Sequence, residues 1–304
     1  MARPDHPVPD VHVAVIGGSF AGLSAALPVA RARRRVALID AGRPRNRFAA
    51  ASHNFLNHDG LPPAEITRRG RAELARYPTA TIRRAAVDGV AREGEGFRLT
   101  LDDGTALTAA RLVLATGVQD RLPDIPGLAE RWGQSVVHCP YCHGYEFGGA
   151  PLGVLITDPA VTHQAVLVTD WGPVTVFTGG HVLPDETLRD LDRRGARIEP
   201  VPVVALDGRA PGLTAAVLAD GRRVGIAGLF LPPAPTLAGD LHHRLGCRLS
   251  DGPMGPSIET DGMGATGVPG VFAAGDAAGR MPSAAIAAAS CLMAGTAAHR
   301  SLVF

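Results

Sequence analysis

The sequence predicts an α/β fold that begins with a Rossmann-like dinucleotide-binding unit. Three segments support this prediction, and each is an apolar run that ends in a turn of small residues: VHVAVIGGSFAG at 11–22, LVLATG at 112–117 and GVPGVFAAGDAA at 267–278. A short apolar run bounded by turn residues is typical of a buried strand. The length of 304 residues fits roughly two domains of about 150 residues each.

The first segment has the order of a nucleotide-binding unit. A strand over 11–16 leads into the turn Gly17–Gly22, a helix follows, and a second strand ends at Asp40. Gly17 allows a tight turn and Gly22 allows the helix to pack on the strand, while Asp40 can accept hydrogen bonds from a ribose. The helix N-terminus offers amide groups to a pyrophosphate. Ser19 replaces a usual glycine, and an ordinary glycine turn is the alternative interpretation.

The segment over 267–278 predicts a second group of contacts to the same nucleotide. Its strand ends at Gly275–Asp276, and an alanine-rich helix begins near Ser283. An acid at a strand end can hold a polyol chain while the following helix N-terminus faces an electron-rich ring. The strand over 112–117 ends in the small-residue turn Thr116–Gly117. Taken alone, each of these segments is also compatible with a simple strand end.

Composition excludes several functional classes. A formal net charge of +1 does not favour a nucleic acid partner. Every basic residue is arginine, so Schiff-base chemistry and a Walker A lysine are excluded. The N-terminus lacks the layout of a signal peptide, and no apolar run reaches the roughly 18 residues of a membrane span. Four cysteines are too few for a disulfide framework, so we expect a cytoplasmic protein without membrane contact.

Together with a CxxC sequence at 139–142, the three segments resemble the low-molecular-weight thioredoxin reductase family of flavoproteins. The resemblance implies two Rossmann-like dinucleotide-binding domains, the second inserted into the first. The FAD-binding domain is expected over 1–119 and 246–304, and the inserted domain over 120–245. Proline-marked stretches at 121–127 and 250–257 fit the two linkers. The resemblance also implies a homodimer, because twofold assemblies are the commonest.

The resemblance implies which residues hold FAD. The glycine turn and Asp40 hold its ADP half, Asp276 contacts the ribityl chain, and the stretch SHNFLNHDG at 52–60 lies near the flavin unless it is only a structural loop. The expected cofactor-binding residues are Gly17, Gly18, Ser19, Gly22, Asp40, Asn54, Val87, Thr116, Gly117, Gly275, Asp276, Ser283 and Ala284.

The stretch HCPYCHGYEF, residues 138–147, contains two cysteines, two histidines and an acid. A structural zinc site usually needs four ligands, and Cys247 and Cys291 are single and distant in sequence, so we expect no metal. A structural disulfide is unexpected in a cytosolic enzyme. Beside a flavin, the pair is best explained as a redox-active dithiol, in which the attacking thiol needs a lowered pKa.

The family resemblance assigns a role to each residue of this stretch. Cys142 faces the isoalloxazine and Cys139 exchanges with substrate. His143 stands where related reductases carry an aspartate, so the acid/base role passes to an imidazole. Glu146 can orient it. His138 is a second candidate for this role, and an ordinary surface histidine is the alternative.

The inserted domain lacks the signals of an NADPH site. Its turn DPAVTHQA at 158–165 contains no glycine and carries Asp158, and its next strand, at 174–180, is not followed by an arginine pair. The stretches CPYCHGYE, SHNFLNHDG and HQAVLV resemble the small-molecule dithiol oxidases of gliotoxin and holomycin biosynthesis. That resemblance implies a small-molecule dithiol substrate, with electrons passing through the CxxC and FAD to oxygen. The alternatives are a thioredoxin reductase-like enzyme that uses NADPH or another donor, and a non-catalytic flavin-binding redox sensor.

Overall fold

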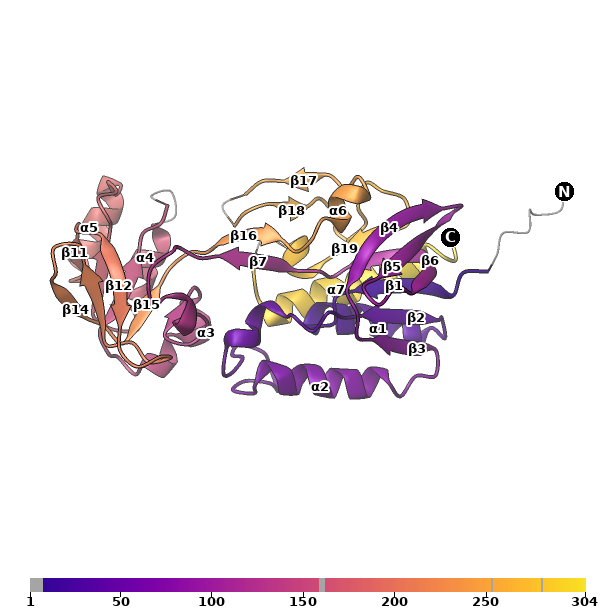
Figure 1. The fold of residues 1–304 in the computed structure, drawn as a ribbon, viewed down its shortest axis with the longest axis horizontal. Coiled ribbons are helices and arrows are strands. Elements are labelled where there is room, and N and C mark those ends of the chain that lie inside the picture. The colour runs from indigo at the N-terminus through magenta and orange to yellow at the C-terminus, as the bar shows by residue number, and fades with distance from the viewer. Residues whose placement is uncertain (1–7, 159–161, 253, 280) are drawn as a thin grey trace. The chain divides into compact units, whose positions relative to one another are not determined.

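The chain folds into two compact units of α/β structure, as the sequence predicts (Figure 1). The computed structural model describes residues 8–158, 162–252, 254–279 and 281–304. Unit 1 comprises Met1–Arg45, Pro63–Gln119 and Pro235–Phe304, and unit 2 comprises Asn46–Pro62 and Asp120–Ala234. Most of unit 2 is therefore inserted between two parts of unit 1. Among the described residues, no helix is long and apolar enough to cross a membrane.

Unit 1 is built on a sheet with the strand order β3-β2-β1-β6-β5-β4, in which β19 also pairs with β6. Its strands are β1 (Val11–Ile16), β2 (Val36–Ile39), β3 (Ala80–Arg83), β4 (Val87–Glu93), β5 (Gly96–Leu101), β6 (Ala106–Leu114) and β19 (Val271–Ala273). Strands β3, β2, β1, β6 and β19 are parallel to their neighbours in this series, whereas β5 is antiparallel to both β4 and β6.

Strand β6 changes its partner along its length. Residues 106–109 pair with β5, residues 112–114 pair with β19, and β1 runs along the other edge. Because β2, β1, β6 and β19 are parallel, their carboxyl ends lie at one edge of the sheet. Open α/β sheets bind ligands at this edge, where neighbouring connections leave on opposite sides. The structure thus gathers there the turns that the sequence predicts to hold FAD.

The helices of unit 1 explain why its central strands carry apolar residues on both faces of the sheet. They are α1 (Phe20–Arg31), α2 (Pro63–Leu74), α6 (Leu241–Arg244) and α7 (Ala284–Arg300), with a 3-10 turn, η4, at Gly275–Ala277. Helices α1 and α7 lie side by side (Figure 1). Val13 and Val15 of β1 pack in the same core cluster as α1 and α7, whereas Ala14 and Ile16 pack in the cluster on the opposite face. Burial on both faces therefore favours apolar residues on both sides of each central strand.

Unit 2 contains a second Rossmann-like sheet with the order β11-β10-β9-β15-β8, in which all pairs are parallel. Its strands are β8 (Val136–Val137), β9 (Leu152–Leu155), β10 (Val174–Phe177), β11 (Arg197–Glu199) and β15 (Gly228–Phe230). Helices α4 (His163–Val168) and α5 (Asp185–Arg193) connect β9, β10 and β11 in turn. The antiparallel strands β12 (Val203–Asp207), β13 (Ala215–Leu218) and β14 (Arg223–Gly225) form a smaller sheet.

The short helical segments of unit 2 follow one another ahead of β9. They are η2 (Ala129–Arg131), α3 (Pro140–His143) and η3 (Tyr145–Phe147). The two boundary strands, β7 (Val118–Arg121) and β16 (Ala234–Leu237), pair with each other. Both passages of the chain between the units therefore occur within paired strands.

The return of the chain to unit 1 occurs earlier than the expected position, 246. It lies at Pro235, because Leu237, Leu241 and Leu245 pack against the core of unit 1. The proline-marked stretch at 250–257 is not the linker but the connection within unit 1 between β17 (Leu249–Ser250) and β18 (Ser257–Ile258); residue 253 of that stretch lies outside the described residues.

Segment 46–62 also differs from the expected division, which places it in the FAD-binding domain. It groups with unit 2. The 3-10 turn η1 (Arg45–Phe48) begins this segment, and Phe48 lies so close to Gly133 that a Cβ there would collide with it. Further contacts join the segment to the CxxC stretch and are described below. These contacts join residues that are distant in sequence, so no local sequence pattern predicts them.

Candidate functional site

The glycine turn after β1 is closely packed. Gly17 has φ +107°, and a Cβ at this position would collide with the carbonyl oxygen of Ala115, after β6. A Cβ at Gly22 would collide with the carbonyl oxygen of Gly17. Both positions therefore require glycine, for the reasons that the sequence indicates: a left-handed backbone at Gly17 and close helix–strand approach at Gly22.

Asp40 follows β2 and lies buried against this turn, next to Gly18. One carboxylate oxygen accepts a hydrogen bond from the Gly42 amide at 3.0 Å. The other contacts Arg71 of α2, whose guanidinium also donates to the Gly18 carbonyl oxygen at 3.4 Å. Sequence reasoning missed Arg71, because no local pattern links α2 to the glycine turn.

Asp276 occupies the corresponding place after β19, within η4. Its Oδ2 accepts a hydrogen bond from Arg45 Nη1 at 2.9 Å. The two side chains line a small cleft together with Val118 and Pro235. Arg45 was also missed, since it lies 231 residues from Asp276 in the chain. The structure thus brings a guanidinium to each of the two acids that the sequence assigns to FAD.

The remaining predicted cofactor residues of unit 1 are distributed over its strand ends and helix starts. Thr116 and Gly117 follow β6, and Gly117 has φ +71°. Ser19 and Ser283 immediately precede α1 and α7, and neither side chain makes a capping hydrogen bond. Ala284 is the first residue of α7. Val87 begins β4 and packs against the core of the sheet.

The redox-active pair predicted from the sequence lies in unit 2. Cys139 and Cys142 form a disulfide with Cα atoms 5.3 Å apart, and both residues are half-buried. Cys139 is the residue before α3, and Pro140 opens the helix, a position that suits proline because its missing N–H has no helical partner there. Helix α3 spans only four residues, so its dipole is short and side chains must supply most of the local electrostatics.

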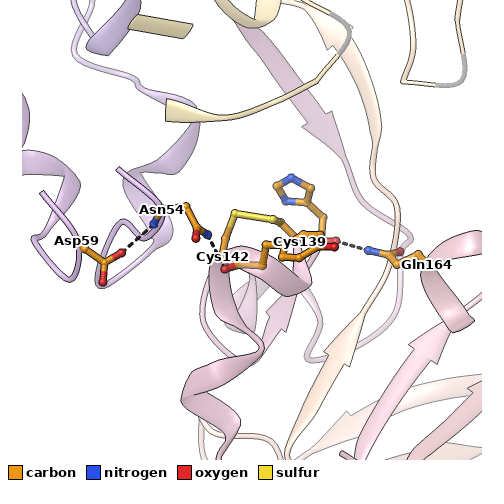
Figure 2. The surroundings of a disulfide bond; sticks show 7 residues. Asn54, Asp59, Cys139, Cys142 and Gln164 are labelled. Atoms are coloured by element: carbon orange, nitrogen blue, oxygen red, sulfur yellow. Dashed lines mark hydrogen bonds between the residues drawn. A yellow bond between two sulfur atoms is a disulfide. The ribbon is translucent and has the colours of Figure 1, made fainter. Parts of the chain in front are cut away.

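Two side chains hold this turn from opposite sides (Figure 2). Asn54 Nδ2 donates to the carbonyl oxygen of Tyr141, between the two cysteines, at 2.6 Å. Gln164 of α4 is buried, and its Nε2 donates to the carbonyl oxygen of His138. Asn54 is the one predicted cofactor residue outside unit 1. Within unit 2 it binds the CxxC turn, and a contact with the flavin stays a prediction.

His143 ends α3 and is half-buried. Burial lowers the pKa of His143 below its ordinary value of 6.5; the carboxylate of Glu146 acts in the opposite direction, and His53 lowers the pKa further. The imidazole is therefore neutral at neutral pH, the form that can accept a proton. His53 lies beside Glu146, with 3.3 Å between its Nε2 and Glu146 Oε1.

His138 differs from His143 in its surroundings. Its ring centroid lies 6.2 Å from that of Trp132, with the ring planes tilted by 31°. It immediately precedes Cys139 and is half-buried, so His138 lies next to the pair in the sequence and beside an aromatic ring.

Comparison with known proteins places this geometry in a family. The sequence matches the pyridine nucleotide-disulphide oxidoreductases over residues 11–168. It is 34% identical to thioredoxin reductase sirT of Leptosphaeria maculans, over 87% of this chain and 86% of that protein. The chain belongs to the pyridine nucleotide-disulphide oxidoreductase family. The predicted thioredoxin reductase-like flavoprotein with FAD as its cofactor is confirmed.

Two solved structures resemble this pyridine nucleotide-disulphide oxidoreductase along nearly its whole length. An oxidoreductase from Agrobacterium tumefaciens is 45% identical, with a TM-score of 0.92 and coverage of 97% of this chain and 99% of that one. HlmI is 40% identical, with a TM-score of 0.90 and coverage of 96% and 92%. The fold of both units is therefore shared with these proteins.

The cofactor edge of unit 1 fits FAD on its own geometry. The glycine turn allows the backbone to approach a pyrophosphate, and Asp40 lies where a ribose is bound in such units. Arg71 adds a positive charge beside this turn, and its buried Nε finds no hydrogen-bond partner among the described residues. A buried donor without a partner indicates a site that a ligand or water satisfies, which is consistent with a nucleotide at this edge.

The other two cysteines of this family member are free thiols outside the Cys139–Cys142 disulfide. Cys247 and Cys291 are buried thiols. Burial raises the pKa of both, that of Cys291 to about 12 with a further contribution from Asp276. Because the thiolate is the reactive form, both side chains are inert at neutral pH. Within the part of the chain that the structure describes, no group of three or more His, Cys, Asp and Glu side chains is arranged to hold a metal ion.

Proposed function

We propose that this flavoprotein is a dithiol oxidase that closes a disulfide in a small-molecule dithiol, with dioxygen as electron acceptor. The observation that carries the proposal is the contact that α4 of unit 2 makes with the CxxC segment. In a dinucleotide-binding unit the helix after the first strand presents its N-terminus to a pyrophosphate. Here Gln164, in the first turn of that helix, binds the CxxC segment through the carbonyl oxygen of His138.

The turn ahead of α4 supports the same proposal. The sequence at 158–165 contains no glycine and carries Asp158, whose negative charge opposes a pyrophosphate. Residues 159–161 of this turn lie outside the described residues. In this proposal electrons enter from a donor other than NADPH, and a substrate dithiol is the donor that a CxxC pair accepts directly. The resemblance of the CxxC and SHNFLNHDG stretches to small-molecule dithiol oxidases agrees with this route.

The surface beside the disulfide suits an apolar small molecule. Tyr141 lies between the cysteines and Tyr145 follows them, and both side chains are exposed. Tyr141 also packs edge-on against Trp171, with ring centroids 5.3 Å apart. Exposed aromatic side chains beside a reactive centre offer a large contact area with a polar group at its edge.

The residues of this site can carry out the thiol exchange in two steps. Neutral His143 accepts a proton from a substrate thiol, and the resulting thiolate attacks the Cys139 sulfur. The Cys139–Cys142 bond breaks, a mixed disulfide forms, and Cys142 leaves as a thiolate that the imidazolium stabilises. The second substrate thiol, once deprotonated, attacks the substrate sulfur of the mixed disulfide. The substrate disulfide forms and Cys139 leaves as a thiolate.

The residues of unit 1 would hold the group that reoxidises the pair. The glycine turn, Asp40 and Arg71 would hold the ADP half of FAD, and Asp276 its ribityl chain. FAD held there would supply the two-electron redox chemistry that links the dithiol pair to dioxygen. The overall reaction converts one dithiol and one dioxygen to one disulfide and one hydrogen peroxide, so that both electrons and both protons are accounted for.

Oxygen consumption tests this proposal. The holoenzyme in air with dithiothreitol should consume oxygen and release an equal amount of hydrogen peroxide. Cys139→Ser should abolish this turnover because it removes the attacked sulfur, whereas Cys247→Ser, which changes a buried thiol outside the pair, should retain it. A wild-type enzyme that consumes no oxygen with dithiothreitol would contradict the proposal.

A further inference from the structure

His53 lies between two carboxylates that come from distant parts of the chain. Its Nε2 is 3.3 Å from Glu146 Oε1, and its Nδ1 is 3.5 Å from Asp59 Oδ2. Each ring nitrogen therefore faces one acid. An imidazole in this position can take up a proton at one nitrogen and release another from the second.

The loop that carries His53 is closed upon itself. The Ser52 amide donates to the carbonyl oxygen of Leu61 at 2.8 Å, and the Gly60 amide donates to that of Ser52 at 2.9 Å. Within the loop, the Asn54 amide donates to Asp59 Oδ1 at 2.8 Å. Because Asp59 Oδ1 accepts the Asn54 amide hydrogen bond, its second oxygen, Oδ2, is the one that faces His53. The loop thus presents His53 and Asp59 as a pair, and the Asn54 side chain fixes the loop to the CxxC turn.

The cluster begins close to the redox pair in the chain and ends at an exposed acid. Glu146 lies three residues after His143, and Gly144 between them has right-handed helical backbone angles that join α3 to η3, so the two positions have helical spacing. His143 is half-buried. Beyond it, the side chains of Glu146, His53 and Asp59 are 46%, 20% and 68% exposed. The last member, Asp59, is the most exposed of the three, which is the arrangement expected of an outlet.

We propose that Glu146, His53 and Asp59 form a proton relay that returns His143 to its neutral form after each thiol deprotonation, with His53 as the central positioning residue. The inference rests on the proposed function. The His143 imidazolium passes its proton to the Glu146 carboxylate, which passes it to His53 Nε2. His53 then releases the proton on Nδ1 to Asp59, from which it reaches water. No electrons move, and each group returns to its starting charge.

A relay is needed because the thiol exchange requires two deprotonations by one base. Each dithiol gives up two protons during the thiol exchange, yet His143 can hold only one. His143 must therefore discharge its proton before the second substrate thiol can react. A half-buried base that discharges slowly would limit the rate at this point, and a neighbouring proton acceptor removes that limit.

Anaerobic reduction of the bound flavin by dithiothreitol tests the relay. The reduction is monitored by stopped-flow absorbance at about 450 nm. His53→Gln keeps a polar side chain but cannot carry a proton, and we expect it to slow the reduction about tenfold, less than the loss of a direct general base. His53→Ala in the presence of free imidazole should recover much of the rate. The matched control is His181→Gln, which changes an exposed histidine of the same unit.

The pH profile separates a proton-carrying role from a structural one. His53 lowers the pKa of His143, so His53→Gln should also move the acid limb of the reduction rate to higher pH. A rate and profile equal to those of wild type would overturn the relay, and so would a slow variant that imidazole does not restore and whose profile is unchanged. If dithiothreitol fails to reduce the wild-type flavin, the proposed function itself fails, and the relay with it.

Discussion

Replacing Asp276 with alanine removes the carboxylate expected to hold the ribityl chain of FAD, and the structure predicts two separate effects. The first is on the stability of the apoprotein. Asp276 and Arg45 are 21% and 16% exposed and 2.9 Å apart. Hydrogen bonds to charged groups contribute about 1.5–3 kcal/mol when buried and exposed ion pairs less than about 1 kcal/mol. Asp276→Ala should therefore lower the free energy of unfolding by about 1–2 kcal/mol.

The second effect is on cofactor affinity. If the Asp276 carboxylate also binds a ribityl hydroxyl, its loss removes a charge-assisted hydrogen bond of about 1.5–3 kcal/mol, which corresponds to about 10- to 100-fold weaker FAD binding. The assay is FAD titration of the apoprotein, followed by quenching of flavin fluorescence. Urea unfolding of the same apoprotein measures the first effect independently.

The matched control is Asp240→Ala. Asp240 also forms an ion pair with an arginine of unit 1, Arg244, at 2.8 Å, but this pair is exposed and contributes little. Asp240→Ala should leave both stability and FAD affinity almost unchanged. An Asp276→Ala protein that binds FAD as tightly as Asp240→Ala would refute the assignment of Asp276 to the cofactor.

Three further predictions concern the redox site. Cys139→Ser should leave a thiolate at Cys142 that gives a long-wavelength charge-transfer band with oxidised FAD, and Cys142→Ser should not; a band in the second variant alone would reverse the two roles. His143→Ala should slow anaerobic flavin reduction by dithiothreitol about 10²–10⁴-fold, with His138→Ala as the milder control; an equal loss in both variants would contradict the role of His143. Burial lowers the pKa of His143, and Glu146 opposes this shift. The wild-type reduction rate should therefore stay constant at neutral pH and fall below pH 6.5, and Glu146→Gln should move that fall to still lower pH. A shift to higher pH in the stopped-flow profile would contradict this.

The parts of the fold that were predictable are those with a local cause. The run VHVAVI is a strand buried on both faces, and its pattern is readable because burial on both sides excludes polar residues from nearly every position. Gly17 and Gly22 were assigned correctly to a tight turn and a close helix approach, since no other residue fits either place. The parallel arrangement of the strands then follows from the order of strands and helices.

The parts that were missed depend on contacts between distant residues. Proline-rich composition pointed to a linker at 250–257, yet the chain re-enters unit 1 at Pro235 because Leu237 and Leu241 complete its core. The grouping of segment 46–62 with the CxxC turn rests on single contacts such as Asn54 to Tyr141. Arg71 was missed for the same reason: an arginine in an amphipathic helix is expected at the surface, and nothing local in the sequence indicates that it pairs with Asp40.

The central claim is that electrons enter this flavoprotein from a dithiol and not from NADPH. Anaerobic stopped-flow mixing of the holoenzyme with micromolar NADPH, and in parallel with dithiothreitol, tests it most directly. The structure places Gln164 of α4 on the CxxC segment, and the turn before α4 carries Asp158 and no glycine, so NADPH should reduce the flavin slowly or not at all while dithiothreitol bleaches it. Rapid, saturable reduction by NADPH would contradict the account and favour a thioredoxin reductase-like enzyme.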